Sequence, residues 1–551
     1  MKRRLLVLLL SLILIVMGTS AQSEDTLIWS LVGGDISTLN PALATDGTSL
    51  TVISALFDNL FRVNPETGLP EPGLTSWSIS EDGLQYTFTI REDAVWSDGT
   101  PITAADVKFT YDAILSDTVE SPRKADIGAI ASLEVIDDQT FVATLEAPNC
   151  TIWGSAFVNL PPLPSHMFEA DFSDFMTSSF NTAPSVTSGP YMFDERSSGE
   201  FVRLVANPSY YDGAPAIPNL LYRIIADPAT LNQALQTGAV DYGFIYPDQF
   251  EQLTQRDIFN SFVYPLNNAP IVIMNYQDPN NLQNAYDEDG NLNELVPNQF
   301  FADIRVRQAV AMGYDKAALA MTQGPEAGSV PLSGPIVPAF YEAYDMADIE
   351  PWEYNPERAA ELLEEAGWEM GSDGVRVKDG VRFEVDLVYS KLVDLWGNAA
   401  LIMQDQLGEI GIRINIIEQE WSAYLGNVLL SGEFDITIVG FGGGTEIDGI
   451  AYNLLYSRNL VLDGGGFNLA GYVNPEMDEL LDTARTLPGC DVAERAELYR
   501  EVQRIARDDV AYDWLVSTTQ VHVLNQRVDE AYIGQWSGVP NWELIGWGFG
   551  Q

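Results

Sequence analysis

Residues 84–115 read LQYTFTIREDAVWSDGTPITAADVKFTYDAIL and join a strand, a turn and a helix whose local signals agree. Apolar and polar residues alternate over 84–90, which is the period of a strand with one buried face. The turn at 97–99 ends this strand. Thr103 and Asp106 can then cap the first amides of a helix. We interpret Trp96 as a core aromatic and Asp98 as a turn former, so this stretch predicts structure and no catalysis.

The first 21 residues have the features of a secretory signal peptide. Three basic residues at positions 2–4 precede an apolar run over 5–17, and small residues follow up to Ala21. A signal sequence has an apolar run of roughly 7–15 residues, whereas a membrane-spanning helix needs roughly 20. The first cysteine is Cys150, so we expect no lipid-modified N-terminus. We therefore expect an exported protein, periplasmic or extracellular in the cell envelope.

The composition is that of a large and strongly acidic protein. The chain has 551 residues, of which 46% are hydrophobic, so it can bury a substantial core. Its length predicts roughly three or four domain-sized units. Its 79 acidic and 28 basic residues give a formal net charge of −51 at pH 7. Such a charge repels nucleic acids and anionic lipids, so neither is an expected partner.

Cysteine and histidine are too few to build a typical zinc or copper site. Cys150 and Cys490 form one disulfide in an oxidising compartment or remain as two buried thiols, and the sequence leaves both alternatives open. His166 and His522 have no second histidine or cysteine at metal-ligand spacing. We therefore expect no metal ligands and no cofactor, and we interpret His166 as a packing residue.

Capping signals mark several further elements. Residues 27–31 read as a first strand, and apolar residues at helical spacing predict a helix within 50–61. Three dipeptides place a capping side chain before a proline at the first helical position. They are Asp227-Pro228, Asn355-Pro356 and Asn474-Pro475. These devices organise folding and carry no chemistry.

Two polar segments have only part of a ligand-binding signature. Asp287, Asp289 and Asn291 are calcium-type ligands, but Gly290 falls two positions early for an EF-hand, so we predict a surface loop. The glycine-rich run 440–444 follows a predicted strand, but no Gly-Lys-Ser/Thr sequence follows it, which argues against nucleotide binding. This run favours close approach of a ligand to the backbone.

An ordered series of motifs resembles the family 5 extracellular solute-binding proteins. The series comprises residues 88–91, 96–101, 103–107, 161–166, 188–191, 207–211, 303–309 and 432–436. The blocks follow the family order from about residue 27 to about residue 517. Members of this family deliver oligopeptides, dipeptides, nickel chelates or oligosaccharides to ABC importers. The resemblance therefore implies a receptor, with an ABC permease and ATPase subunits as its partners and no enzymatic activity.

The resemblance implies an α/β, two-lobed periplasmic-binding-protein-like fold with an extra inserted domain. Mixed sheets flanked by helices form both lobes, and the ligand cleft lies between them. After the signal peptide, domain I would be discontinuous and domain II would be inserted into it, while domain III would form the second lobe. The expected boundaries are 1–21 for the signal, 22–58 with 184–266 and 516–551 for domain I, 59–183 for domain II and 267–515 for domain III. The implied mechanism is closure of the lobes of a monomeric receptor around its ligand.

The same resemblance implies where the ligand lies. One wall would be the loop Thr45-Asp46-Gly47, although an ordinary polar loop before a helix fits these residues equally. The other wall would hold Trp421 and the segment Phe441, Gly442, Gly443, Gly444 and Thr445. Extended peptides in this family are held largely through their backbone, while their side chains occupy roomy pockets.

One departure from the family pattern concerns recognition of the ligand's α-amino group. Peptide-binding members carry an aspartate three residues after the aromatic that corresponds to Phe441, and that position is Gly444 in this chain. Asp448 lies four residues further on and takes the amine-binding role if the loop is rearranged. Otherwise an oligosaccharide or another non-peptide solute becomes the more credible ligand.

Two other classes of protein compete with the importer receptor. A secreted hydrolase fits the size, and acidic pairs such as Glu418 and Glu420 are present, but 79 acidic residues produce such pairs by chance. Neither Gly-x-Ser-x-Gly nor His-Glu-x-x-His occurs in the sequence. The second rival is a sensor or chaperone-like module of the same fold that serves no transporter. A peptide-class importer receptor is our main prediction.

Overall fold

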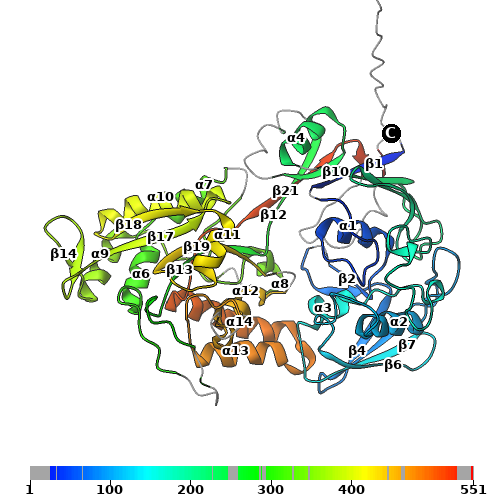
Figure 1. Ribbon diagram of the computed structural model, residues 1–551, viewed down its shortest axis with the longest axis horizontal. Coiled ribbons are helices and arrows are strands. Elements are labelled where there is room, and N and C mark those ends of the chain that lie inside the picture. Colours follow the sequence, from blue (N-terminus) through cyan, green and yellow to red (C-terminus); the bar gives the residue numbers. More distant parts are fainter. Residues whose placement is uncertain are drawn as a thin grey trace, which may run out of the picture.

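The computed structural model describes residues 25–529, except 33, 65, 226, 246–252, 254–257, 285–286, 288–292, 325–327, 345–347, 444–445 and 461–465, together with 548–549. The predicted signal peptide, residues 1–21, lies outside the described residues, as do Asp289, Gly290 and Asn291. Figure 1 shows two lobes side by side, which we call the N lobe and the C lobe. No helix within the described ranges is long and apolar enough to cross a membrane.

The N lobe is built around a seven-stranded mixed sheet in the order β12-β21-β11-β1-β10-β9-β8. β1 runs parallel to β10 and β11, and the other neighbours are antiparallel. The strands are β1 (Thr26–Val32), β8 (Tyr191–Ser197), β9 (Phe201–Ala206), β10 (Asn219–Ile225), β11 (Tyr242–Ile245), β12 (Phe259–Pro265) and β21 (Thr519–Asn525). The predicted first strand is confirmed and lies at the centre of this sheet.

The stretch 84–115 forms a strand and a helix, as predicted. β5 (Gln85–Ile90) buries alternate side chains in a four-stranded antiparallel sheet of order β4-β5-β7-β6. Its neighbours are β4 (Thr75–Ile79), β6 (Ile130–Val135) and β7 (Thr140–Leu145). α2 (Ala104–Leu115) begins at a capping box, in which Asp106 accepts a 2.9 Å hydrogen bond from the N–H of Thr103. Trp96 is fully buried, which confirms it as a core aromatic.

Several short elements lie on the side of the N lobe that faces the C lobe (Figure 1). They are α1 (Gly47–Leu56), the pair β2 (Phe61–Val63) and β3 (Pro70–Pro72), and α3 (Ile152–Ser155). The helix predicted within 50–61 therefore starts earlier and ends earlier. Asp46 caps its N-terminus, and the backbone becomes extended at Phe57, with φ −128° and ψ 127°.

The C lobe holds a five-stranded mixed sheet of order β18-β17-β19-β13-β20. The strands are β13 (Asn268–Met274), β17 (Glu384–Ser390), β18 (Arg413–Gln419), β19 (Ile436–Gly442) and β20 (Asp513–Trp514). α10 (Asp394–Glu409) packs against β17, β18 and β19. A further sheet of order β14-β15-β16 comprises β14 (Glu369–Met370), β15 (Arg376–Lys378) and β16 (Val381–Arg382). After β21 of the N lobe, β22 (Val528–Asp529) pairs with β23 (Gly548–Phe549).

The predicted helix starts are confirmed at all three dipeptides. The side chains of Asp227, Asn355 and Asn474 accept hydrogen bonds from backbone amides of the first turn, each with proline at the start of the helix. These helices are α4 (Pro228–Thr237), α9 (Pro356–Glu365) and α13 (Pro475–Thr486). The others are α6 (Ile304–Met312), α7 (Lys316–Met321), α8 (Tyr341–Tyr344), α11 (Trp421–Tyr424), α12 (Gly449–Leu455) and α14 (Val492–Asp509).

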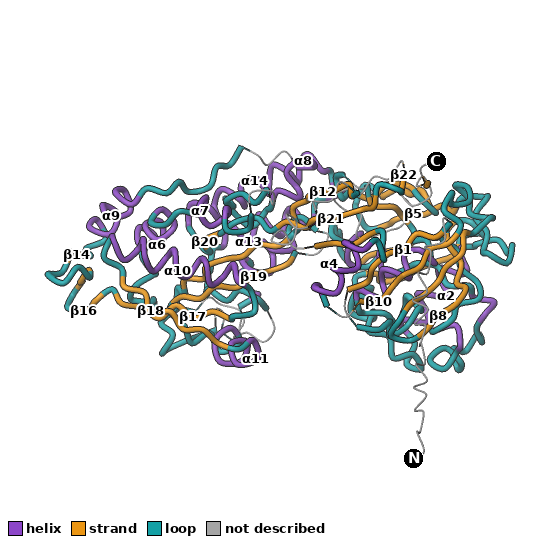
Figure 2. The backbone as a smooth tube through the Cα atoms, turned by 90° about the horizontal axis from the view of Figure 1, so that it is seen from above, coloured by secondary structure: helices purple, strands orange, loops and turns teal. Residues whose placement is uncertain are grey.

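The chain passes between the lobes at two neighbouring segments. β12 leads into β13, and β20 leads into β21, so each segment joins the sheet of one lobe to that of the other. The N–H of Leu266 donates to the carbonyl of Thr518 at 2.9 Å, which ties the segments together. Figure 2 shows β12 and β21 running side by side between the lobes.

The structure also joins the two cysteines. Cys150 and Cys490 form a disulfide with a Cα–Cα distance of 5.3 Å across a sequence separation of 340 residues. Of the two alternatives that the sequence left open, the disulfide is therefore the one that the structure contains.

Candidate functional site

The N lobe carries a cavity of about 480 Å³ beside α1. Leu50 and Ile53 of α1 line it together with Phe61 of β2, while Asp58 and Arg123 add polar groups. Sites for small ligands are typically concave, apolar in the main, and about 300–1,000 Å³ in volume. The size and the mixed lining of this cavity therefore suit part of a small organic ligand.

The N-terminus of α1 is fixed by the loop that the sequence analysis placed against the ligand. Asp46 accepts hydrogen bonds from the N–H of Ser49 at 2.7 Å and from the hydroxyls of Ser37, Thr48 and Ser49. Burial opposes ionisation of Asp46, but these hydrogen bonds outweigh it and hold its pKa well below the usual range. Asp46 is thus occupied as a helix cap, while Thr45 and Gly47 beside it are exposed.

A neighbouring segment supports the same loop from behind. The hydroxyl of Ser121 donates to the carbonyl of Ala42 at 2.7 Å, and the guanidinium of Arg123 donates to the carbonyl of Ala44. Both carbonyls belong to the turn that precedes α1. The position of the cavity wall therefore depends on residues that lie about 80 positions apart in the sequence.

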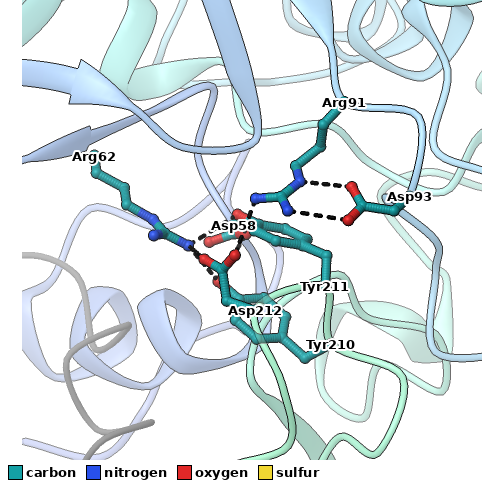
Figure 3. A network of polar contacts seen from close by, with 7 residues as sticks. All are labelled: Asp58, Arg62, Arg91, Asp93, Tyr210, Tyr211 and Asp212. Carbon is teal, nitrogen blue, oxygen red and sulfur yellow. Dashed lines mark hydrogen bonds and ion pairs between the residues drawn. The ribbon is translucent and has the colours of Figure 1, made fainter.

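Two residues of the cavity lining, Asp58 and Arg62, belong to a network of charged and tyrosine side chains (Figure 3). The hydroxyls of Tyr210 and Tyr211 both donate to the carboxylate of Asp58, and the hydrogen bond from Tyr210 is 3.0 Å long. The Arg62 guanidinium donates to both hydroxyls. Arg62 and Arg91 both pair with Asp212, and Arg91 also pairs with Asp93. Burial raises the pKa of Asp58 to about 6, although the tyrosines and Arg62 act in the opposite direction.

The C lobe presents an aromatic wall. Trp421 begins α11, is 37% exposed, and lies 6.4 Å from Trp396 between ring centroids. Phe441, near the end of β19, meets Phe467 edge-on at 5.2 Å. Phe467, which the sequence analysis did not single out, is 48% exposed. Exposed aromatic rings of this kind offer large apolar contact areas to a ligand.

The loop after β19 is attached to the segment that crosses between the lobes. The N–H of Gly443 donates to the carbonyl of Asn267 at 3.0 Å, and the Asn267 amide donates to the carbonyl of Glu446 at 3.2 Å. A Cβ atom at Gly443 would lie 2.6 Å from the Asn267 side chain, so glycine permits this close approach. Gly442 is exposed, and Gly444 and Thr445 lie outside the described residues.

Asp448 is fully buried and has a basic partner within its own lobe. The Nε of Arg485 lies 3.1 Å from an Asp448 carboxylate oxygen, and the guanidinium stacks 3.6 Å from the centre of the Tyr452 ring. In this conformation the Asp448 carboxylate neutralises Arg485 and is not exposed to the cleft.

Glu446 is the acidic residue of this loop that faces the other lobe. Its carboxylate accepts a 3.0 Å hydrogen bond from the N–H of Gly154. Burial and the neighbouring Asp448 raise its pKa to about 7. It also lines a cavity of about 60 Å³ between the lobes, which shares Phe61 and Gly154 with the larger cavity. In the sequence, Glu446 stands out only by its place two residues after Gly444.

The two histidines lie in separate structural settings. His166 contacts Asp98 at 3.0 Å, and His522 contacts the Tyr242 hydroxyl at 2.7 Å, where burial lowers its pKa to about 4. In the part of the chain that the structure describes, no group of three or more His, Cys, Asp or Glu side chains is placed to hold a metal ion.

Comparisons with known proteins identify the family and the fold of the chain. Residues 70–459, more than half of the chain, match the model of the bacterial extracellular solute-binding proteins, family 5 Middle. The oligopeptide-binding protein AppA of Bacillus subtilis is 26% identical over 90% of this chain and 87% of its own length. Protein XP55 of Streptomyces lividans is 29% identical over 90% of this chain and 84% of its own length.

Solved structures show the same fold. HbpA2 of Haemophilus parasuis superposes with a TM-score of 0.77, at 22% identity, over 96% of this chain and all of its own. AppA of Bacillus subtilis in complex with a nonapeptide gives a TM-score of 0.66, over 96% of this chain and 99% of its own. The fold is thus that of the two-lobed α/β binding proteins, and the chain belongs to the family 5 bacterial extracellular solute-binding proteins.

Proposed function

We propose that this protein is the extracytoplasmic receptor of an ABC importer and that it captures a peptide-class solute by closing its two lobes. The observation that carries the proposal is the cavity of about 480 Å³ on the N lobe, which adjoins the contact between the lobes near Gly154. The relationship to an oligopeptide-binding protein over 90% of the chain supports a peptide as the ligand class.

The ligand-binding residues of this proposal come from both lobes. They are Thr45, Asp46 and Gly47 in the N lobe, and Trp421, Phe441, Gly442, Gly443, Gly444, Thr445 and Asp448 in the C lobe. Asp46 and Asp448 act indirectly, the first by capping α1 and the second by holding Arg485. We add Glu446 as the partner of a ligand ammonium group, because its carboxylate borders the interlobe cavity. An ammonium ion placed there would favour the charged carboxylate.

A receptor of the same fold for a non-peptide solute is the second candidate. Two observations favour it: glycine occupies position 444, and Asp448 is already paired with Arg485. If Glu446 serves only the contact with Gly154, no acidic group of this loop remains for an amine. An oligosaccharide or a chelate would then fit the aromatic wall better than a peptide would.

The cellular setting of the proposal is the cell envelope. We propose that residues 1–21 direct export. The Cys150–Cys490 disulfide supports this, because disulfides persist in oxidising compartments outside the cytoplasm. We also propose the domain division given above, a monomeric receptor, and an ABC permease with its ATPase subunits as partners. The receptor itself would catalyse no reaction, so peptides and glycosides incubated with it should remain intact.

Native mass spectrometry of freshly purified mature protein tests the ligand class. The mass of the intact complex is measured, the protein is then denatured, and the released molecules are identified. A ladder of peptide masses is the expected result, and a sugar or chelate mass would establish the second candidate instead. If the protein is empty, a thermal-shift screen with peptide and oligosaccharide libraries follows. A rise in Tm with oligosaccharides and none with peptides would contradict the peptide proposal.

A further inference from the structure

The Cys150–Cys490 disulfide joins the two lobes covalently. Cys150 directly precedes the α3 region of the N lobe. Cys490 lies in the turn between α13 and α14 of the C lobe. The bond therefore adds a third covalent link to the two segments in which the backbone crosses between the lobes.

Hydrogen bonds between the lobes surround this bond. The N–H of Cys150 donates to the carbonyl of Arg485 at 2.7 Å, and the Arg485 guanidinium donates to the Thr151 hydroxyl at 3.3 Å. Three positions after Thr151, the N–H of Gly154 donates to the carboxylate of Glu446 at 3.0 Å. A short segment of the N lobe, residues 150–154, thus contacts both α13 and the loop after β19.

The disulfide lies away from the crossing strands. In Figure 1, β12 and β21 pass between the lobes in the upper part of the molecule. The α13–α14 pair reaches toward α3 in the lower part. The backbone connection is held by Leu266 and Thr518, whereas the second connection is held by residues 150–154 and 485–490. The lobes are therefore attached at two separate places.

We propose that this disulfide is a tether that sets how far, and about which axis, the lobes open. Two rigid bodies that are attached at two separate places can only rotate about the line that joins those places. Hinge motion at the crossing segments alone would also permit twisting and separation of the lobes. The disulfide prevents twisting and separation of the lobes near Cys150 and Cys490, since bonded cysteines keep their Cα atoms about 4.4–6.8 Å apart. The inference rests on the lobe closure of the proposed function, and it concerns the ligand-free protein.

The structure offers suitable positions for a direct measurement of opening. Ile136 in the N lobe and Leu401 on α10 in the C lobe are 59% and 60% exposed. Spin labels attached through p-acetylphenylalanine at these two positions leave both cysteines untouched. Double electron–electron resonance of the ligand-free protein then reports the distribution of distances between the lobes.

The comparison uses the oxidised protein, the Cys150→Ser/Cys490→Ser variant, and the labelled wild type after reduction with a phosphine. We expect a shift of the distribution to longer distances, with greater width, in the variant and in the reduced protein, and its return on reoxidation. The reduced wild type keeps the test valid if the variant folds poorly. Superimposable distributions in oxidised and reduced protein would overturn the proposal.

Thr151→Ala is the matched control, because it removes an interlobe hydrogen bond and leaves the disulfide in place. Its distribution should match that of the oxidised wild type. A shift as large as that of the double serine variant would assign the restraint to the hydrogen bonds and overturn the role of the disulfide. The distance measurement is made without ligand, so it stays valid if native mass spectrometry finds no peptide. Likewise, a failed tether would leave the mass-spectrometric test of the ligand class unaffected.

Discussion

Trp421 and Phe441 are the residues that the family resemblance assigns to one side of the proposed cleft, and both are at least partly exposed on the C lobe. Glu446 was missed, since an acidic residue in a chain with 79 acids carries no signal until its carboxylate is seen beside Gly154. The role expected of Asp448 depends on Arg485, which lies 37 positions later in the sequence. The sequence therefore suggested single residues for the proposed site only where a motif named them, because the contacts of the others come from distant parts of the chain.

Trp421→Ala and Phe441→Ala are expected to weaken ligand binding without unfolding the protein. Each substitution removes aromatic contact area at the proposed cleft, and truncating such a residue costs about 1.4 kcal/mol or more, which is tenfold in Kd. Isothermal titration calorimetry with the solute identified by mass spectrometry checks the change in Kd, and a melting curve checks the fold. Tyr354→Ala, an exposed aromatic beside α9, should leave Kd unchanged. Unchanged Kd in both cleft variants would place the cleft elsewhere.

Asp58→Asn is expected to change how stability depends on pH. The folded pKa of Asp58 is raised from 3.8 to about 6, so the folded protein binds more protons than the unfolded chain between these values. Stability from this group is present below about pH 4 and is lost as pH rises through 6. The free energy of unfolding falls by about 3 kcal/mol over this range, because each pKa unit corresponds to about 1.4 kcal/mol.

Melting temperatures between pH 4 and pH 8 test this expectation. The difference in Tm between the wild type and Asp58→Asn should fall as pH rises from 4 to 7 and should stay constant above pH 7. Tyr210 and Tyr211 can still donate to the asparagine oxygen, and Arg62 and Asp212 stay in place, so the network survives the substitution. Asp138→Asn, at an exposed position, is the control. Parallel curves for wild type and Asp58→Asn would contradict the burial argument.

At the scale of elements, local signals predicted helix starts correctly where a capping side chain directly precedes a proline. The caps Asp227, Asn355 and Asn474 act through amides within three residues, so the sequence alone determined them. α1 was placed several residues too late, because the prediction followed the apolar stripe and not the cap Asp46, which accepts a hydrogen bond from the N–H of Ser49 three residues on. The periodic apolar stripe that predicted the helix continued past its true end, where Phe57 turns into extended backbone.

Asp46→Ala is expected to lower both stability and ligand affinity. Loss of an N-cap costs about 0.5–2 kcal/mol, and α1 carries Leu50 and Ile53 of the cavity wall. Asp227→Ala provides the matched control, since Asp227 caps α4 in the same lobe and does not line this cavity. Both variants should melt earlier, but only Asp46→Ala should raise Kd. Equal Kd values for the two variants would contradict the role of α1 in the site.

At the scale of the whole molecule, the sequence predicted two lobes through its ordered motifs and could not predict how they touch. Cys150 and Cys490 are 340 positions apart, and no local pattern states whether they meet. The contact of Glu446 with Gly154 spans 292 positions and depends on the packing of both lobes. The cavity and the interlobe contact are therefore properties of the assembled fold, whereas the fold class follows from motif order.

The net charge of −51 predicts that binding kinetics depend on the charge of the solute. A strongly acidic receptor attracts cations from a distance, and such steering changes association rates by 10-fold to about 10³-fold at low ionic strength. Salt removes the effect, since the Debye length falls to about 10 Å at 0.1 M. For lysine-rich and glutamate-rich peptides of equal length, stopped-flow tryptophan fluorescence at increasing NaCl should show the association rate falling for the first and rising for the second. The dissociation rates should change much less, because the field acts before contact. Identical salt dependence for the two peptides would mean that the acidic surface lies too far from the cleft entrance to steer ligands, and that its role is solubility alone.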